Sequence, residues 1–345
     1  MNPSVTDPRP QRALRLAVGV ALGTALGFGL ALPLPFLTPV LVLFLLAMSN
    51  QPLGLKGSLI LALVVGLTCS CGLLLLPLLR HSPPSGVLLV ALGLFLCFRF
   101  ALRGGSGLVA NLMVVGLTLI TAAGTASMAL GQEVLIALVK AALLTGLCVS
   151  LVHALFPEPI GLPPTPAPTP ASDPLSSWIA LRATLVVVPT WLLAMVDPAS
   201  YLALIMKAVS LGQQTCVTNA RMAGRELLGS TLLGGLLAIA LWSLLSILPH
   251  LWLFFLLVLL FVLLLARRLY QLTRTRYSAS FWLNTAITLL ILLGQSVQDS
   301  ASGKDVYTAF AVRMCLFILV TLYAYLAVLL IDQRSPIPGA DKTCS

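Results

Sequence analysis

Apolar residues run almost continuously along the chain and are interrupted at intervals by short polar or proline-containing segments. Each run is about 18–25 residues long, the length that a helix needs to cross a hydrocarbon core of about 30 Å. The runs are rich in Leu and Ala and do not alternate with a period of two, so they favour helices over barrel strands. The pattern predicts an all-α integral membrane protein of about twelve transmembrane helices, at residues 13–32, 36–53, 55–77, 85–102, 106–130, 133–156, 177–196, 199–218, 222–248, 250–267, 279–298 and 305–331.

One connection differs from the others in length and composition. It reads PEPIGLPPTPAPTPASDP from Pro157 to Pro174. Such a proline-rich segment is typical of an extended polyproline tether without a core of its own. The predicted domains are a first six-helix half at residues 1–156, a cytoplasmic linker at 157–176, a second six-helix half at 177–332 and a cytoplasmic tail at 333–345.

Matched residues in the two halves indicate an internal repeat. Ala13-Leu14-Arg15 corresponds to Ala180-Leu181-Arg182 at the start of the first helix of each half. Further pairs at matching positions are Asn50-Gln51 with Gln213-Gln214, Lys56 with Arg225, His81 with His250, Asn111 with Asn284, and Glu133-Val134 with Asp305-Val306. Six helices is an even number, so the halves have the same orientation, and we expect two parallel repeats related by an axis along the membrane normal.

The distribution of basic residues predicts the orientation in the membrane. When the N-terminus is placed in the cytoplasm, most of the 20 Lys and Arg residues fall at cytoplasmic helix ends and connections. Arg80 and Lys304 are the exceptions on the opposite side. This positive-inside bias predicts a multi-pass protein of a bacterial inner membrane with both termini in the cytoplasm.

Composition excludes several classes of function. Hydrophobic residues make up 59% of the chain and charged residues only 9%, against about 25% charged residues in soluble domains. The sequence contains no Walker A motif, no Ser-His-Asp or paired-carboxylate arrangement, and no CxxC pair among its seven cysteines. We therefore expect no enzyme activity, no metal site and no cofactor. The net charge of +10 comes from cations at helix ends and does not indicate nucleic-acid binding.

The segment from Arg225 to Gly235 reads RELLGSTLLGG, a basic residue at a cytoplasmic helix start followed by Gly-Ser-Thr-Leu and small residues. A weaker counterpart in the first half has Leu37-Thr38-Pro39 entering the second helix, then Pro52, Gly54 and Lys56. Together with the Arg-led first helix of each half, these features resemble the fusaric acid resistance and aromatic acid exporter superfamily. The chain lacks the large cytoplasmic domain that bigger members carry between their halves, so it resembles a compact branch.

This resemblance implies an exporter of small organic acids or drugs. Bacterial members are similar to proton-driven pumps and often work with a periplasmic adaptor of the membrane-fusion class, whereas plant relatives are anion channels for carboxylates. We therefore expect a secondary transporter for efflux of small aromatic or carboxylic acids. A passive organic-anion channel and a non-transporting membrane subunit of an assembly are the alternatives.

Three cations inside predicted helices are the candidate substrate-binding residues. Lys140, Lys207 and Arg313 each lie about 10–12 Å below the outer end of their helix. Charges inside a membrane are costly, so we expect these three to line a cavity and hold the carboxylate of a substrate. Structural ion pairs, or side chains that extend outward to water, are the alternative interpretation.

Other polar residues complete the candidate site. Asn111, Asn284, Gln213 and Gln214 are candidates to line the path of a polar solute, or alternatively to form caps and interhelical hydrogen bonds. Glu133 and Asp305 occupy matching positions at outer helix ends and are candidate proton acceptors. The alternative is that they are acidic residues stabilising a helix N-terminus. His81, His153 and His250 are candidate proton carriers because His titrates near neutral pH, but we interpret them as simple surface residues.

Overall fold

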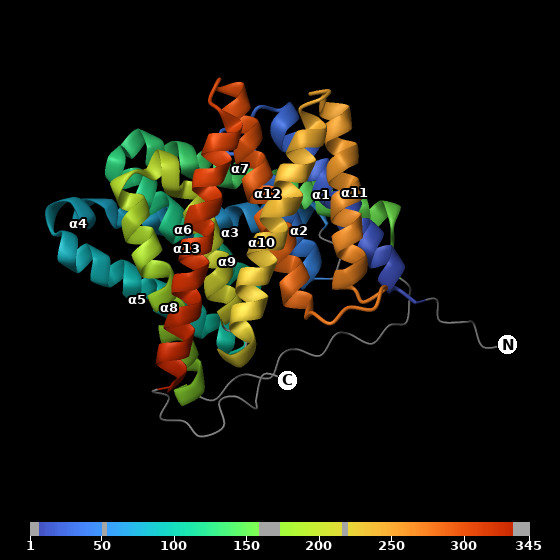
Figure 1. The fold of residues 1–345 in the computed structure, drawn as a ribbon. Coiled ribbons are helices and arrows are strands. Elements are labelled where there is room, and N and C mark those ends of the chain that lie inside the picture. The colour runs from blue at the N-terminus through green and yellow to red at the C-terminus, as the bar shows by residue number, and fades with distance from the viewer. Residues whose placement is uncertain (1–6, 50–53, 159–172, 216–219, 334–345) are drawn as a thin grey trace.

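A computed structural model describes residues 7–49, 54–158, 173–215 and 220–333. Throughout these ranges the regular elements are α-helices, and Figure 1 shows them gathered into one bundle. They are α1 (Arg9–Gly29), α2 (Leu37–Met48), α3 (Leu55–Leu74), α4 (Leu76–His81), α5 (Pro83–Leu102), α6 (Gly107–Ala126), α7 (Met128–Leu155), α8 (Asp173–Val196), α9 (Pro198–Thr215), α10 (Ala220–Leu245), α11 (Leu251–Leu269), α12 (Ala279–Ala301) and α13 (Val306–Gln333). The all-α prediction is confirmed, and each of the twelve predicted spans corresponds to one helix. Most of the predicted linker, the tail from residue 334 and the Asn50-Gln51 pair lie outside the described residues.

Helix boundaries differ from the prediction by up to five residues, as at the end of α2 and the start of α7, and two of the differences lie at prolines. The third predicted helix ends at Leu74, and α4 follows as a separate short helix. Pro77 explains the break, because it has no N–H and its ring excludes the carbonyl four residues earlier. The helix α8 starts at Asp173, four residues before the expected start, and Pro174 is its second residue. Proline is favoured in the first turn of a helix, where its missing N–H costs nothing.

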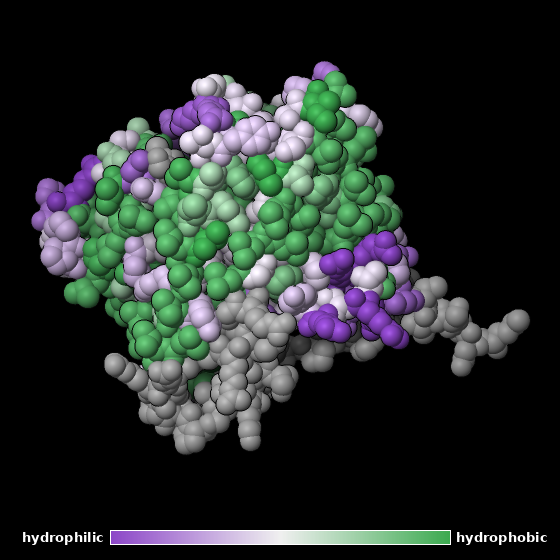
Figure 2. All heavy atoms as spheres, viewed as in Figure 1, coloured by the Kyte–Doolittle hydropathy of each residue, from purple (hydrophilic) through white to green (hydrophobic). Residues whose placement is uncertain are grey.

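The surface of the bundle is that of a membrane protein. Ten segments of the described chain are long and apolar enough to cross a membrane. Figure 2 shows a broad hydrophobic band between hydrophilic ends. On α3, for example, Leu63, Leu67 and Leu74 are more than 60% exposed. Such a surface is unfavourable in water and favourable in lipid. The protein is therefore a multi-pass membrane protein in contact with the bilayer.

The helices α2 and α9 lie inside the bundle and are not among those ten segments. All residues of α2 from Leu37 to Leu46 are buried, as are those of α9 from Leu204 to Gly212. The helix α9 is enclosed by contacts with α6, α8, α12 and α13. Because neighbouring helices shield it from lipid, α9 can carry a polar side chain that does not face hydrocarbon.

Helix pairings recur between the two halves. In the first half α1 packs against α2, and α3 packs against α6 and α7; in the second, α8 packs against α9, and α10 packs against α12 and α13. Contacts between the halves are reciprocal too, with α1 against α11 and α8 against α5, as Figure 1 shows at opposite sides of the bundle. A buried hydrogen bond of 2.9 Å from Trp191 Nε1 on α8 to Thr121 Oγ1 on α6 also joins the halves. These pairings agree with two parallel six-helix repeats.

Glycines on α1 allow close packing against the second helix and the turn that precedes it. A Cβ at Gly27 would lie 2.5 Å from the carbonyl oxygen of Pro35, and one at Gly19 would lie 2.7 Å from Leu46 Cδ1. Real Cβ atoms do not approach other atoms this closely, so a larger residue at Gly27 would displace the backbone of the turn, whereas at Gly19 the end of the Leu46 side chain would have to move. The spacing of four residues between Gly19, Gly23 and Gly27 is thus a packing feature, as the small-residue pattern predicts.

A proline inside α8 is compensated by a tyrosine from α13. Pro189 has no N–H, so the carbonyl of Leu185, four residues earlier, loses its helical partner. The hydroxyl of Tyr323 donates a hydrogen bond of 2.7 Å to that carbonyl oxygen. An unsatisfied carbonyl in lipid costs several kcal/mol. Tyr323 therefore makes the proline tolerable at this position.

Glu158, just beyond the end of α7, is bound by the first turns of α1. Its carboxylate accepts a hydrogen bond of 2.8 Å from Arg15 Nη1 and one of 2.6 Å from Arg12 Nε. Arg15 is only 2% exposed, so it needs this counter-charge. Burial by itself would raise the pKa of Glu158, but the hydrogen bonds and charges of the two arginines outweigh it and lower the pKa. This ion-pair cluster holds the two ends of the first half together.

Candidate functional site

The most deeply buried cation in the described chain is Lys207 on α9, whose side chain has no exposed surface. Its Nζ donates hydrogen bonds of 3.0 Å to Asn284 Oδ1 and 2.8 Å to Thr288 Oγ1, both on α12. Thr288 can accept this bond because its own hydroxyl proton is donated to the backbone carbonyl of Asn284 at 2.8 Å. The lysine is thus fixed between two neutral acceptors one helical turn apart.

Two serines extend this arrangement into a network across three helices. Ser210 on α9 donates to Asn284 Oδ1 at 3.3 Å, and Asn284 Nδ2 donates to Ser230 Oγ on α10 at 2.5 Å. None of the five side chains is more than 2% exposed. We call the set of Lys207, Ser210, Ser230, Asn284 and Thr288 the lysine network.

A glycine sets the distance between α10 and α12 beside the lysine network. A Cβ at Gly234 would lie 2.7 Å from Thr288 Cβ and 2.8 Å from the carbonyl oxygen of Thr285. Only a residue without a side chain allows this approach. The small residues of the Gly-Ser-Thr segment therefore position the Ser230 hydroxyl against Asn284.

The positive charge of Lys207 is not balanced by a negative charge in the lysine network. No carboxylate in the described part of the chain contacts Lys207, and its acceptors are an amide and a hydroxyl. Burial disfavours the charged form of a lysine when no counter-charge is present. An ammonium group has three N–H donors, and two of them are used here. The arrangement can therefore take up one further acceptor, such as an anion, or release a proton and remain hydrogen-bonded as the neutral amine.

Arg313 pairs with a carboxylate that sequence reasoning did not connect to it. Its Nη2 donates to Asp299 Oδ1 at 2.9 Å, and its Nη1 pairs with Asp299 Oδ2, a bidentate arrangement. Asp299 is near the end of α12 and is 4% exposed. Arg313 is thus engaged in an ion pair rather than lining a cavity together with Lys207. This outcome matches the structural ion pair that was the alternative interpretation.

Asp305 and Glu133 lie at the surface. Asp305 accepts hydrogen bonds from the backbone N–H of Tyr307 at 3.2 Å and from the Thr308 hydroxyl. The Thr308 hydrogen bond is the main cause that lowers the pKa of Asp305, so the carboxyl is ionised at neutral pH. This is the geometry of a residue that caps the start of α13. Glu133 is exposed on α7, and a role of either residue in proton coupling stays a prediction.

The placement of Lys140 contradicts the predicted cluster of three cations. Lys140 is exposed on α7, on the same face as Ile136, Leu143 and Leu147, which are also exposed. That face is apolar and points to lipid, so a long side chain can extend along it to the membrane surface. The prediction that Lys140 and Lys207 line one cavity is therefore wrong, because Lys207 is enclosed by α9 and α12 in the second half.

The structure places the remaining predicted residues in different environments. Asn284 joins the lysine network, and Asn111 is buried on α6 at the matching position of the first half. Gln213 and Gln214 belong to α9, but their side chains lie outside the described residues. His81 and His250 are exposed as expected, whereas His153 is buried with Nδ1 2.8 Å from the carbonyl oxygen of Val149.

Sequence reasoning missed four residues: Ser210, Ser230, Thr288 and Asp299. Two had a usable signal, since Ser210 follows Lys207 by three residues and Thr288 follows Asn284 by four, spacings that share a helix face. Ser230 and Asp299 had no such signal, because their partners come from other helices. Within the described ranges, no group of three or more His, Cys, Asp or Glu side chains could hold a metal ion.

Comparison with known proteins gives one match. Residues 12–152 match the model of a family described as "Protein of unknown function (DUF2955)". The matched stretch runs from α1 to α7 and so covers the first half of the chain. Neither the curated proteins nor the solved structures contain a match. The resemblance to the fusaric acid resistance superfamily stays a prediction.

Proposed function

We propose that the protein is a secondary transporter of small organic anions and that Lys207 holds the charge of the anion during transit. The observation that carries this proposal is a fully buried lysine, inside a membrane protein, whose only acceptors in the described chain are neutral. Placing a lysine in the middle of a membrane helix costs about 2.5–3.5 kcal/mol. An intramembrane charge with no structural counter-charge is best explained by a ligand that supplies one.

The polar face of α12 supports a route past this lysine. Asn284, Thr288, Ser296 and Asp299 are all buried, and their spacing places them on one side of the helix. Asn284 lies near the start of α12 and Asp299 near its end, 15 residues or about 22 Å apart. An anion that leaves Lys207 would meet Arg313 next, beside Asp299. We propose that separation of α9 and α13 from α12 opens this face to the anion.

Protonation of Lys207 is linked to binding of the anion. With an anion bound, the ammonium form is favoured because the opposite charges attract. Without an anion, the neutral amine still satisfies both acceptors. A proton carried outward with the anion would oppose export driven by an inward proton gradient. We therefore propose that the inward proton moves on a separate group, with Glu133 and Asp305 at the outer helix ends as the candidate acceptors. By resemblance, we propose efflux from the cytoplasm across a bacterial inner membrane, with both termini cytoplasmic and with a periplasmic adaptor as a partner.

Transport in proteoliposomes tests the proposal. The purified protein is reconstituted, and movement of labelled aromatic and aliphatic carboxylates is followed with and without a pH gradient. We expect accumulation that collapses with a protonophore. Lys207→Met should lower the rate about 10- to 100-fold, the value of one or two charge-assisted hydrogen bonds, whereas the control Lys140→Met should transport normally.

Other results would favour the alternatives. Flux that is linear in concentration and unaffected by the protonophore would indicate a passive anion channel. Absence of flux for every carboxylate, in a protein that unfolds cooperatively on heating, would favour a non-transporting membrane subunit. Equal rates for Lys207→Met and the wild type would refute the assigned role of the lysine.

A further inference from the structure

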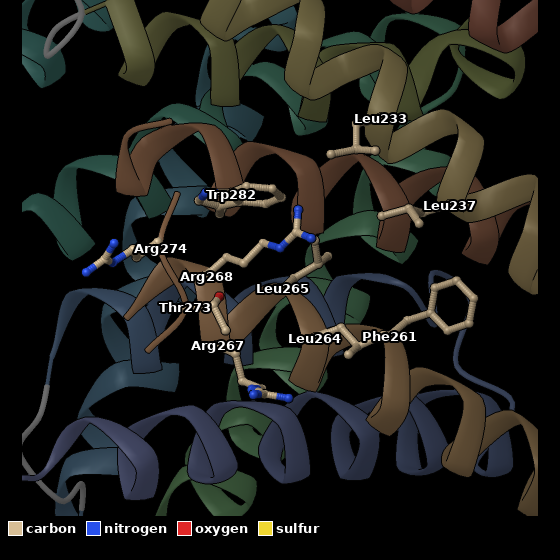
Figure 3. A pocket seen from close by; sticks show the side chains of 10 residues that line it. All are labelled: Leu233, Leu237, Phe261, Leu264, Leu265, Arg267, Arg268, Thr273, Arg274 and Trp282. Atoms are coloured by element: carbon tan, nitrogen blue, oxygen red, sulfur yellow. The ribbon is translucent and has the colours of Figure 1, made fainter. Parts of the chain in front are cut away.

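A cavity of about 570 Å³ lies between α10, α11 and the start of α12, apart from the lysine network. Figure 3 shows its side chains: Arg274 and Trp282 lie toward one end, the guanidinium of Arg268 extends toward Leu265, Arg267 points away from these, and apolar residues line the rest. The cavity exists because α11 packs mainly against α1 of the other half and only lightly against α10. Its lining residues are Leu233, Leu237, Phe261, Leu264, Leu265, Arg267, Arg268, Thr273, Arg274 and Trp282.

The charged end of the cavity is built from three arginines without acidic partners. Arg267 and Arg268 are in the last turn of α11, and Arg274 is in the loop that follows. All three are exposed, and none forms an ion pair with a carboxylate of the described chain. The guanidinium of Arg268 lies 4.7 Å from the centre of the Trp282 ring, and this ring is held by a hydrogen bond of 3.1 Å from its Nε1 to Thr275 Oγ1.

The apolar end of the cavity is continuous with the lipid-facing surface. Leu264 lines the cavity and is 51% exposed, and Leu233, Leu237 and Phe261 are partly exposed beside it. Arginines at the end of a membrane helix lie at the depth of lipid headgroups, and tryptophan is enriched at the same depth. The cavity therefore has the shape and polarity of an amphipathic anion that stands upright in the bilayer.

We propose that this cavity binds a membrane phospholipid with an anionic headgroup. The exposed side chains of Arg267, Arg268 and Arg274 point in different directions in Figure 3 and would turn toward the headgroup phosphate, whose oxygens guanidinium groups bind in a bidentate manner. An acyl chain would lie along Leu233, Leu237 and Phe261. The lipid would fasten α11 to α10 where direct contacts are few, and it would contact Trp282, two residues before Asn284. Lipid composition could thus control the second half of the chain, which contains the lysine network. This inference goes beyond the proposed function.

Lipid retention by the full-length protein tests this inference without any transport assay. The protein is placed in nanodiscs of phosphatidylcholine with and without phosphatidylglycerol, and bound lipid is counted by native mass spectrometry while thermal unfolding is followed in parallel. We expect phosphatidylglycerol to be retained and to raise the unfolding temperature. A charge-assisted hydrogen bond from one arginine to a phosphate is worth at least about tenfold in affinity, so Arg274→Gln should weaken retention about tenfold and Arg267→Gln/Arg274→Gln about 100-fold. Any arginine near the membrane surface contributes about fivefold, so a control outside the cavity should lose less.

Arg276→Gln is the matched control, because Arg276 is exposed in the same loop but does not line the cavity. Loss of retention in Arg276→Gln equal to that in Arg274→Gln would show general surface electrostatics and overturn the proposal. An equal thermal shift from inorganic phosphate or benzoate in phosphatidylcholine alone would show a site for soluble anions and would overturn it as well. Lys207→Met should retain lipid normally, because Lys207 does not line this cavity. The lipid result can therefore be interpreted even if the transport proposal fails.

Discussion

The two halves share their helix pairings but differ in the polarity of the residues at their centres. Matched residues relate α9 to α2 by 163 positions, α10 to α3 by 169 and α12 to α6 by 173, as with Gln214 and Gln51, Arg225 and Lys56, and Asn284 and Asn111. By these relations, the lysine network of the second half corresponds to apolar residues in the first, apart from the shared asparagine. The pairs are Lys207 with Phe44, Ser210 with Ala47, Ser230 with Leu61, Thr288 with Val115 and Asn284 with Asn111.

The difference shows that the same arrangement of helices can enclose either apolar or polar residues at its centre. Phe44, Leu61 and Val115 are all less than 9% exposed, so the first half is stabilised by ordinary apolar burial. The second half places a charge and hydroxyl groups in the same kind of position, at a cost in stability. We therefore interpret the first half as scaffold and the second as the half that handles the anion, and four substitutions test this contrast.

The largest effect is expected at the Asp299–Arg313 ion pair, whose counterparts in the first half are Ala126 and Ala141. Asp299→Ala should destabilise the protein by about 3–5 kcal/mol, because it leaves a largely buried guanidinium without its carboxylate. Asp299→Ala/Arg313→Ala, which gives the second half the residues of the first, should recover most of this loss. Unfolding in detergent measures both, and a double variant that is no more stable than the single one contradicts the interpretation.

The next effect concerns Gly234, whose counterpart in the first half is Val65. Gly234→Ala should cost about 1–3 kcal/mol through overpacking against Thr288. It should also slow transport, because it separates Ser230 from Asn284. Gly54→Ala is the control, since no atom lies within 4 Å of a Cβ at Gly54. Equal stability of these two variants would show that close approach of α10 to α12 is not required.

Tyr323 offers a smaller effect, again in the second half alone. Pro189 and Tyr323 correspond to Leu22 and Leu151 in the first half, where no carbonyl needs a substitute partner. Tyr323→Phe should cost about 1–2 kcal/mol, the range for an unsatisfied polar group. In a Pro189→Leu background the same change should cost almost nothing, because an N–H is restored to the helix. An equal cost in both backgrounds would show that Tyr323 does not compensate for Pro189.

The smallest effect is expected at Glu158, in the first half. Glu158→Gln should cost about 1 kcal/mol at neutral pH, because Gln keeps a hydrogen-bond acceptor for Arg15 and the carboxylate that it replaces is partly exposed and screened. A lowered folded pKa means that the ion pair stabilises the protein above the ordinary glutamate pKa of 4.5 and that this contribution disappears as the pH falls through the lowered value. The wild type should therefore lose more stability on acidification than Glu158→Gln. Asp7→Asn, at an exposed pair with Arg9, serves as control and should show no such difference.

Sequence pattern predicted the helices well, because transmembrane length is a local property. It placed Asn284 and Lys207 in a site, because both are polar inside apolar runs. It did not separate Lys140 from Lys207, since which face of a helix meets lipid depends on neighbours far along the chain. For the same reason it did not connect Arg313 with its partner Asp299, which lies on the preceding helix.

Binding of an organic anion to paired lysine variants tests the contrast between the halves. Thermal stabilisation of the purified protein by a panel of aromatic and aliphatic carboxylates identifies a ligand, and its Kd is then measured for the wild type, Lys207→Met and Lys140→Met. Removing a charge that holds the carboxylate costs about 1.5–3 kcal/mol. We predict a Kd about 10- to 150-fold weaker for Lys207→Met and an unchanged Kd for Lys140→Met. An unchanged Kd for Lys207→Met, or an equal loss in both variants, would contradict the assignment of anion binding to the second half.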